Sequence, residues 1–139
     1  MSGLKILLAD DHREFLEVAS RFLADHSGIN VVGSARSGKE AVQMARDLSP
    51  DLVLMDLSMP DLNGLEATRR IKAIKPPPMV VMLTLYDAPE IQSCARAAGA
   101  DHFITKSDFG ESLPALLVRL FPGLSFSQPG ACAKTYGIA

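Results

Sequence analysis

The sequence has little of what builds a disulfide or transition-metal site. It has two cysteines, Cys94 and Cys132, in no paired or metal-binding spacing, and three scattered histidines, His12, His26 and His102. Isolated thiols fit a reducing compartment better than a disulfide framework, and this scatter argues against a histidine or cysteine metal site. An excess of either charge is also missing, since 14 basic residues stand against 16 acidic ones. We therefore expect no general attraction to nucleic acid or to anionic membranes.

Long hydrophobic runs are absent as well. The longest apolar stretch, 79–85, is interrupted by Thr84 and is far shorter than the roughly 20 residues that a membrane span needs. The start of the chain does not resemble a signal peptide, because only four apolar residues separate Lys5 from Asp10. These absences predict a cytoplasmic protein without membrane contact.

What the sequence does contain is an alternation of short apolar runs and amphipathic segments. The apolar runs predict buried strands at 4–9, 29–35, 52–56, 79–84 and 101–105. Residues at helical spacing predict helices between these strands and after the last one, at about 12–25, 38–48, 65–74, 89–98 and 113–120. Such an alternation favours an α/β fold: a doubly wound, five-stranded parallel sheet in a flavodoxin-like (βα)5 three-layer sandwich.

Several local signals bear on the ends of these elements. Ser37 and Glu40 have the spacing of a capping box, which predicts a helix start. Asp108 and Glu111 offer a cap for the last helix, but Pro114 would then lie deep inside it. A chain of 139 residues fits one domain, which we place at 1–121. Glycine, serine, proline and alanine dominate 122–139, so we expect a loosely ordered tail there.

The chemistry is expected where the strands end. Asp56 closes the most apolar strand, Asp10 and Asp11 follow the first strand, Thr84 ends the fourth and Lys106 follows the fifth. The carboxyl ends of parallel strands meet at one edge of a sheet, where such folds bind ligands. Crowded carboxylates repel one another unless a cation neutralises them, and an oxygen-only site suits Mg2+ (or Mn2+). The pattern predicts a pocket able to accept a phosphoryl group.

Each of these residues also has a simpler interpretation. Asp11 could cap the first helix, and Thr84 could be an ordinary buried strand residue. Phe103 packs in a core whatever else it does, and Lys106 alone would be a solvated lysine. Asp56 is hardest to explain in this way, because an unpaired acid at the end of an apolar strand has no structural need to be there.

Taken together, these residues resemble a known family. The string Asp56-Leu57-Ser58-Met59-Pro60 with Asn63-Gly64, the Asp10-Asp11 pair, Thr84 and Lys106 stand in the order typical of receiver domains of two-component response regulators, the CheY-like superfamily. The resemblance covers residues 4 to about 121. It implies a phosphorylation-dependent signalling switch rather than an enzyme, although the domain takes part in its own phosphorylation and dephosphorylation.

The resemblance also implies a role for each residue. Asp56 would take the phosphoryl group from a histidine kinase or a histidine phosphotransfer protein. Asp11, Asp56 and the backbone carbonyl of Ser58 would bind Mg2+ directly, with Asp10 acting through water. Thr84 and Lys106 would hold the phosphoryl oxygens. Phe103 would be the aromatic switch residue that changes rotamer with Thr84.

Some positions depart from the commoner family pattern. Ser107 follows Lys106 where many members have proline, so the cis bond usual there is not expected. Leu85 stands where a small residue is frequent. Ser58 and Tyr86 flank the path of attacking water, and neither orients water as well as an acid or an amide does. We hypothesise that Tyr86 shields the acyl phosphate and slows self-dephosphorylation.

The apolar stripe of the last helix bears on the output of such a switch. Phosphorylation would shift the surface around the fourth helix, fifth strand and fifth helix, where Val118 and Phe121 widen an apolar stripe that fits a homodimer or an output protein as well as burial under the tail. A stand-alone receiver is the first expectation, with no direct nucleic-acid binding by this chain. The alternative is the receiver portion of a longer DNA-binding transcriptional regulator. A haloacid-dehalogenase-type phosphatase is remote, because Ser58 stands where its proton donor would be.

Overall fold

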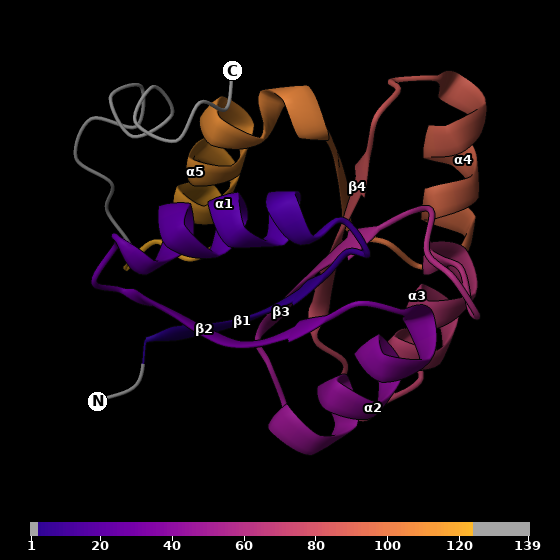
Figure 1. The fold of residues 1–139 in the computed structure, drawn as a ribbon, viewed down its shortest axis with the longest axis horizontal. Helices are drawn as coiled ribbons and strands as arrows, with labels where there is room; N and C mark the ends of the chain where they lie inside the picture. Colours follow the sequence, from indigo (N-terminus) through magenta and orange to yellow (C-terminus); the bar gives the residue numbers. More distant parts are fainter. Residues whose placement is uncertain (1–2, 124–139) are drawn as a thin grey trace.

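Residues 3–123 are described in a computed structural model of the chain, and their core is one parallel sheet (Figure 1). The strand order is β2-β1-β3-β4-β5. The strands are β1 (Leu4–Ala9), β2 (Ile29–Ala35), β3 (Leu52–Asp56), β4 (Met79–Thr84) and β5 (His102–Thr105). The helices are α1 (Arg13–Ala24), α2 (Gly38–Leu48), α3 (Gly64–Lys72), α4 (Pro89–Ala97) and α5 (Phe109–Leu120), with a short 3-10 turn, η1 (Lys106–Asp108), before α5. The predicted fold class is confirmed.

The sheet separates two hydrophobic clusters. Helices α1 and α5 cover one face, and α2, α3 and α4 cover the other (Figure 1). In β3, Leu52 and Leu54 pack toward α1 and α5, whereas Val53 and Met55 pack toward α2, α3 and α4. All residues of β3 are buried, because β1 and β4 flank it and both of its faces are covered. The strand that ends on Asp56 is thus the central one.

The connection after β3 is held tightly against the strand end. The Asn63 side chain accepts a hydrogen bond from the Glu66 N–H at 3.0 Å and caps α3. The Gly64 N–H donates to the Leu57 carbonyl at 2.9 Å. A Cβ at Gly64 would lie 2.2 Å from the backbone oxygen of Asp56, so only glycine fits this close approach. The Asn63-Gly64 turn thereby fixes the main chain at Asp56.

The predicted capping box is present with one change of partner. The Ser37 hydroxyl accepts from the Glu40 N–H at 3.2 Å, as expected. The Glu40 carboxylate, however, accepts from the Arg36 N–H at 2.7 Å, one residue before the cap.

The start of the last helix is earlier than its apolar stripe indicates. Helix α5 begins at Phe109, so Pro114 does lie inside it. Phe109 is fully buried and contacts the rings of Phe15 and Phe22, with centroids 5.3 and 5.6 Å away. This aromatic packing holds the first turn of α5 on α1 and offsets the missing hydrogen bond of the proline. Asp108 occupies the N-cap position without a capping side-chain bond.

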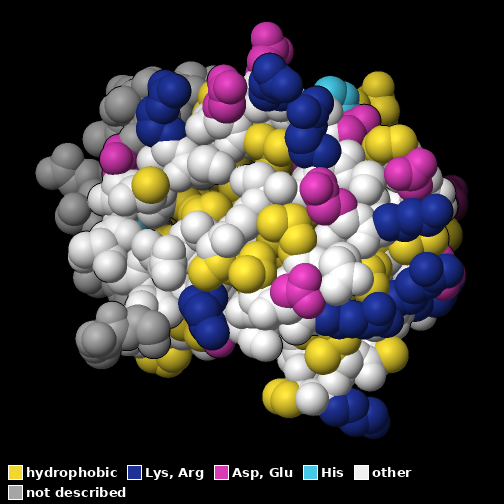
Figure 2. All heavy atoms as spheres, turned by 60° about the horizontal axis from the view of Figure 1, so that its bottom comes forward, with side chains coloured by type: hydrophobic (Ala, Val, Ile, Leu, Met, Phe, Trp, Pro, Cys, Tyr) yellow, Lys and Arg dark blue, Asp and Glu magenta, His cyan; other side chains and the backbone are white. Residues whose placement is uncertain are grey.

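The surface carries no dominating charge on the side shown in Figure 2, the face that carries α2. Basic, acidic and apolar side chains are interspersed there. Within residues 3–123, no helix has the length and hydrophobicity to cross a bilayer. Of the tail predicted at 122–139, residues 124–139 lie outside the described residues, and Cys132 is among them.

Candidate functional site

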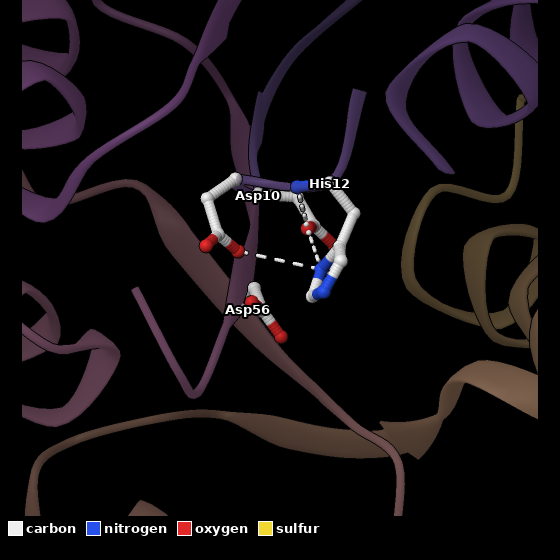
Figure 3. Close-up of side chains that lie close together, drawn as sticks. Asp10, His12 and Asp56 are labelled. Carbon is white, nitrogen blue, oxygen red and sulfur yellow. Dashed lines mark hydrogen bonds and ion pairs between the residues drawn. The ribbon is translucent and has the colours of Figure 1, made fainter. Parts of the chain in front are cut away.

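The acids that the sequence places at strand ends lie together in the folded chain. Asp10 follows β1 and Asp56 ends the neighbouring strand β3, and their carboxylates lie close together at this edge of the sheet (Figure 3). Asp10 is 2% exposed and Asp56 is 4% exposed, whereas Asp11 is half-buried at the rim. Carboxylates so deeply buried and so close to one another are unfavourable unless positive charge compensates them.

Lys106 supplies part of that compensation. Its Nζ lies 2.6 Å from Asp10 Oδ2 and 3.3 Å from Asp56 Oδ1. The ammonium group also lies 4.7 Å from the centroid of the Phe15 ring, a favourable cation–π distance. The side chain of Lys106 is only 9% exposed, so the interpretation as a solvated lysine is wrong. One ammonium group between two buried carboxylates still leaves the pocket short of positive charge.

Asp56 is the group most affected by that shortage. Burial and, to a smaller extent, the neighbouring Asp10 carboxylate raise the pKa of Asp56 from 3.8 to about 6, although Lys106 opposes both. Its Oδ2 is buried and has no hydrogen-bond partner. By contrast, Asp10 Oδ2 lies beside the Lys106 ammonium group and Asp11 Oδ1 beside the His12 imidazole, although without hydrogen-bond geometry. Asp56 therefore offers the pocket one uncommitted carboxylate oxygen.

The turn after β1 holds Asp10 in place through His12. The backbone N–H of His12 donates to Asp10 Oδ1 at 2.8 Å, and its Nδ1 lies 3.0 Å from the same oxygen (Figure 3). His12, not Asp11, is the N-cap residue of α1, so the simpler interpretation of Asp11 as a helix cap is wrong. The carboxylate of Asp11 instead faces the imidazole, 3.3 Å from Nδ1.

The donor set fits a divalent cation. One potential ligand atom from each of Asp10, Asp11, His12 and Asp56 lies within 4.8 Å of the others. The buried Asp56 carboxylate, with one oxygen unpartnered, is the kind of acid that a hard cation satisfies, and Mg2+ binds through one or two carboxylates while keeping several waters. Ser58 follows the same strand end and is exposed; its backbone carbonyl as a ligand stays a prediction.

The remaining predicted residues surround this pocket to different degrees. Thr84 ends β4, is 3% exposed, and its Oγ1 accepts a long hydrogen bond from the Tyr86 N–H at 3.4 Å. Phe103 is half-buried and packs against the cluster on the α2, α3 and α4 side. It also lines a cavity of about 270 Å³ beside α4, so its ring has space to move. The side chain of Tyr86 is 71% exposed, and its shielding of Asp56 stays a prediction.

Two residues of the pocket were missed at the level of sequence. His12 joins the acids although the histidines are scattered along the chain, and its place directly after Asp10-Asp11 was the available signal. Phe15 follows one helical turn later and packs over Lys106, a contact across about ninety residues that no local pattern indicates.

Comparisons with known proteins agree with this geometry. Residues 6–117 match the family model of the response regulator receiver domain. Response regulator GacA of Pseudomonas aeruginosa is 36% identical over 126 residues, which are 91% of this chain and 59% of that protein. Response regulator protein VraR of Staphylococcus aureus is 37% identical over 131 residues, 94% of this chain and 63% of that protein. The chain thus spans less than two thirds of the length of these curated relatives.

Solved structures share the fold. The response regulator domain of Thermotoga maritima CheB has a TM-score of 0.77 at 32% identity, covering 90% of this chain and 98% of that chain. A two-component response regulator of the LuxR family from Aurantimonas has a TM-score of 0.79 at 31% identity, covering 98% of this chain and 96% of that chain. On the strength of the sequence match, the fold and the acid pocket, the chain belongs to the response regulator receiver domain family.

Proposed function

We propose that the chain is a phosphorylation-dependent switch in which Asp56 accepts a phosphoryl group from the phosphohistidine of a sensor kinase or phosphotransfer protein. The observation that carries this proposal is the buried, unpartnered Oδ2 of Asp56 beside Lys106 and two further acids. A carboxylate oxygen without a hydrogen-bond donor is free to act as a nucleophile.

In the proposed transfer, Asp56 Oδ2 forms a bond to phosphorus while the bond from phosphorus to the histidine nitrogen breaks. Asp10, Asp11, Asp56 and the Ser58 carbonyl would hold Mg2+ (or Mn2+), which when bound neutralises charge on the phosphoryl oxygens. Lys106 Nζ, 3.3 Å from the other oxygen of Asp56, is placed to donate to a phosphoryl oxygen. Transfer is thus a matter of position and charge rather than of an added acid or base.

The same arrangement suggests how phosphorylation of Asp56 would change the conformation of the domain. A phosphoryl oxygen attracts the hydroxyl of Thr84, because the hydrogen bond that its Oγ1 accepts from the Tyr86 N–H is long, at 3.4 Å, and weak. Movement of Thr84 toward Asp56 vacates space that Phe103 can enter from its half-buried position. The population of the phosphorylated arrangement then changes the surface of α4, β5 and α5, where an output protein or a second copy would bind.

Receiver domains are signalling domains rather than conventional enzymes, and we infer that this one catalyses only its own phosphorylation and dephosphorylation, in the cytoplasm. A second candidate is the receiver portion of a longer DNA-binding transcriptional regulator. It is favoured by the greater length of the curated relatives and by the similarity to a LuxR-family regulator. In either case Asp56 would be the acceptor.

Incubation with a small phosphodonor tests the proposal. Wild type, treated with acetyl phosphate in the presence of Mg2+, should gain the mass of one phosphoryl group, and the gain should be lost with EDTA. Asp56→Asn should gain nothing, whereas Asp47→Asn, which changes an exposed carboxylate on α2, should behave as wild type. Unchanged phosphorylation of Asp56→Asn would overturn the assignment.

A further inference from the structure

His12 lies among the metal-binding acids in a position to act on the metal itself. Its Nδ1 lies 3.0 Å from Asp10 Oδ1 and 3.3 Å from Asp11 Oδ1, in the cluster that also includes Asp56 (Figure 3). The imidazole is 60% exposed, so it can turn without disturbing the core. Its backbone is fixed by the bond from the His12 N–H to Asp10. The ring is therefore tethered at the pocket and free to adjust.

A cation in the pocket would meet both oxygen and nitrogen. The Asp56 carboxylate is buried and its Oδ2 has no hydrogen-bond partner, so this cluster of acids lacks positive charge. The four candidate ligand atoms lie within 4.8 Å of one another. Ligands about 2.1 Å from an ion lie at most about 4.2 Å apart, so movements of less than about 1 Å would bring all four to a shared ion.

We propose that His12 Nδ1 is a ligand of this site and shifts its preference from Mg2+ toward first-row transition metals such as Mn2+, Co2+ and Zn2+. Imidazole nitrogen is a good ligand for these ions, whereas Mg2+ prefers oxygen and keeps its waters. This inference rests on the metal site of the proposed function. It adds a nitrogen ligand to a site otherwise made of oxygen.

The opposite role for His12 is physically reasonable and gives the opposite result. An imidazolium ion paired with Asp10 and Asp11 would occupy the space of the metal and would weaken the binding of every divalent ion to the same extent. If His12 is a ligand, its removal weakens the binding of transition metals selectively. If it is a competitor, its removal strengthens the binding of all divalent ions.

Calorimetric titration at one neutral pH separates the two roles. We would measure the Kd of Co2+ and of Mg2+ for wild type, His12→Gln and His102→Gln; the last removes a histidine at the start of β5, away from the pocket. His12→Gln should raise the Kd of Co2+ about tenfold or more, by comparison with the cost of losing groups that support a metal site. Its Kd for Mg2+ should be nearly unchanged, and His102→Gln should match wild type for both ions.

Electron spin-echo modulation of bound Mn2+ gives a direct second readout. A nitrogen nucleus coordinated to Mn2+ should modulate the echo in wild type and in His102→Gln, and the modulation should disappear in His12→Gln. The proposal is overturned by an unchanged Co2+ Kd, by tighter binding of both ions to His12→Gln, or by persistence of the modulation in that variant. Failure of wild type to bind Mg2+ or accept phosphate would instead overturn the proposed function.

Discussion

Asp56 should destabilise the metal-free domain at neutral pH, and Asp56→Asn should relieve that cost. The carboxyl is 4% exposed, and burial with Asp10 nearby raises its pKa from 3.8 to about 6. Between these two pH values the folded chain binds the proton more tightly than the unfolded chain, so the stability of wild type falls as pH rises through this window. It should level off above pH 6, once Asp56 is ionised in both states.

The size of the effect follows from the same values. The difference between 3.8 and about 6 corresponds to about 3 kcal/mol of unfolding free energy, which is a ceiling for the gain. The value of about 6 already includes the attraction of Lys106, 3.3 Å from Asp56 Oδ1, so its loss in asparagine needs no separate subtraction; imperfect hydrogen bonding of the new amide lowers the gain by about 1 kcal/mol. Asp56→Asn should therefore be more stable than wild type by about 1 to 3 kcal/mol above pH 7 and nearly equal to it at pH 4.

Urea unfolding followed by circular dichroism, in EDTA, at several pH values between 4 and 8 measures this difference. Asp47→Asn, an exposed change on α2, is the matched control and should show no such dependence on pH. Saturating Mg2+ should stabilise wild type more than Asp56→Asn, because binding to the folded state adds stability. A difference that is constant with pH, or an Asp56→Asn variant less stable than wild type at pH 8, would refute the reasoning.

Three further outcomes follow from single contacts. Tyr86→Glu should speed loss of phosphate from phosphorylated protein, timed by intact mass, and an unchanged or slower rate would refute the shielding hypothesis. Thr68→Val should raise the unfolding free energy by up to about 1 kcal/mol, because the buried Oγ1 of Thr68 has no hydrogen-bond partner. A lower unfolding free energy in urea would contradict this and show that the hydroxyl makes a stabilising hydrogen bond. Gly64→Ala should lower the unfolding free energy by about 2 kcal/mol or more and slow phosphorylation, because its Cβ would clash with the Asp56 carbonyl. Gly123→Ala, with open space around it, should change neither the unfolding free energy in urea nor the phosphorylation rate with the phosphodonor by much.

The strands could be predicted from the sequence nearly to the residue, because most are short apolar runs, and those at 4–9, 52–56 and 101–105 end at or just before a charged residue. The predicted strand at 52–56 is observed at Leu52–Asp56, and the one at 79–84 at Met79–Thr84. The site followed from this, since parallel strands bring Asp10 and Asp56 to one edge whatever the loops do. The convergence of the acids needed only the order of elements.

What the sequence could not predict depends on contacts between distant elements. Phe109 begins α5 because its ring packs on Phe15 and Phe22, and nothing near Phe109 in sequence records those partners. The burial of Lys106 similarly depends on Asp10 and on the Phe15 ring, which a local pattern of a lysine after a strand does not contain. Tertiary packing decided both cases.

The alternation of side chains along β3 has a mechanical consequence. Leu52 and Leu54 touch one layer of helices while Val53 and Met55 touch the other, and Asp56 stands at the end of the same strand. A small shift of this strand along its axis would change the packing of both helix layers at once. A change at the Asp56 carboxylate would thus alter the packing on both faces of the sheet.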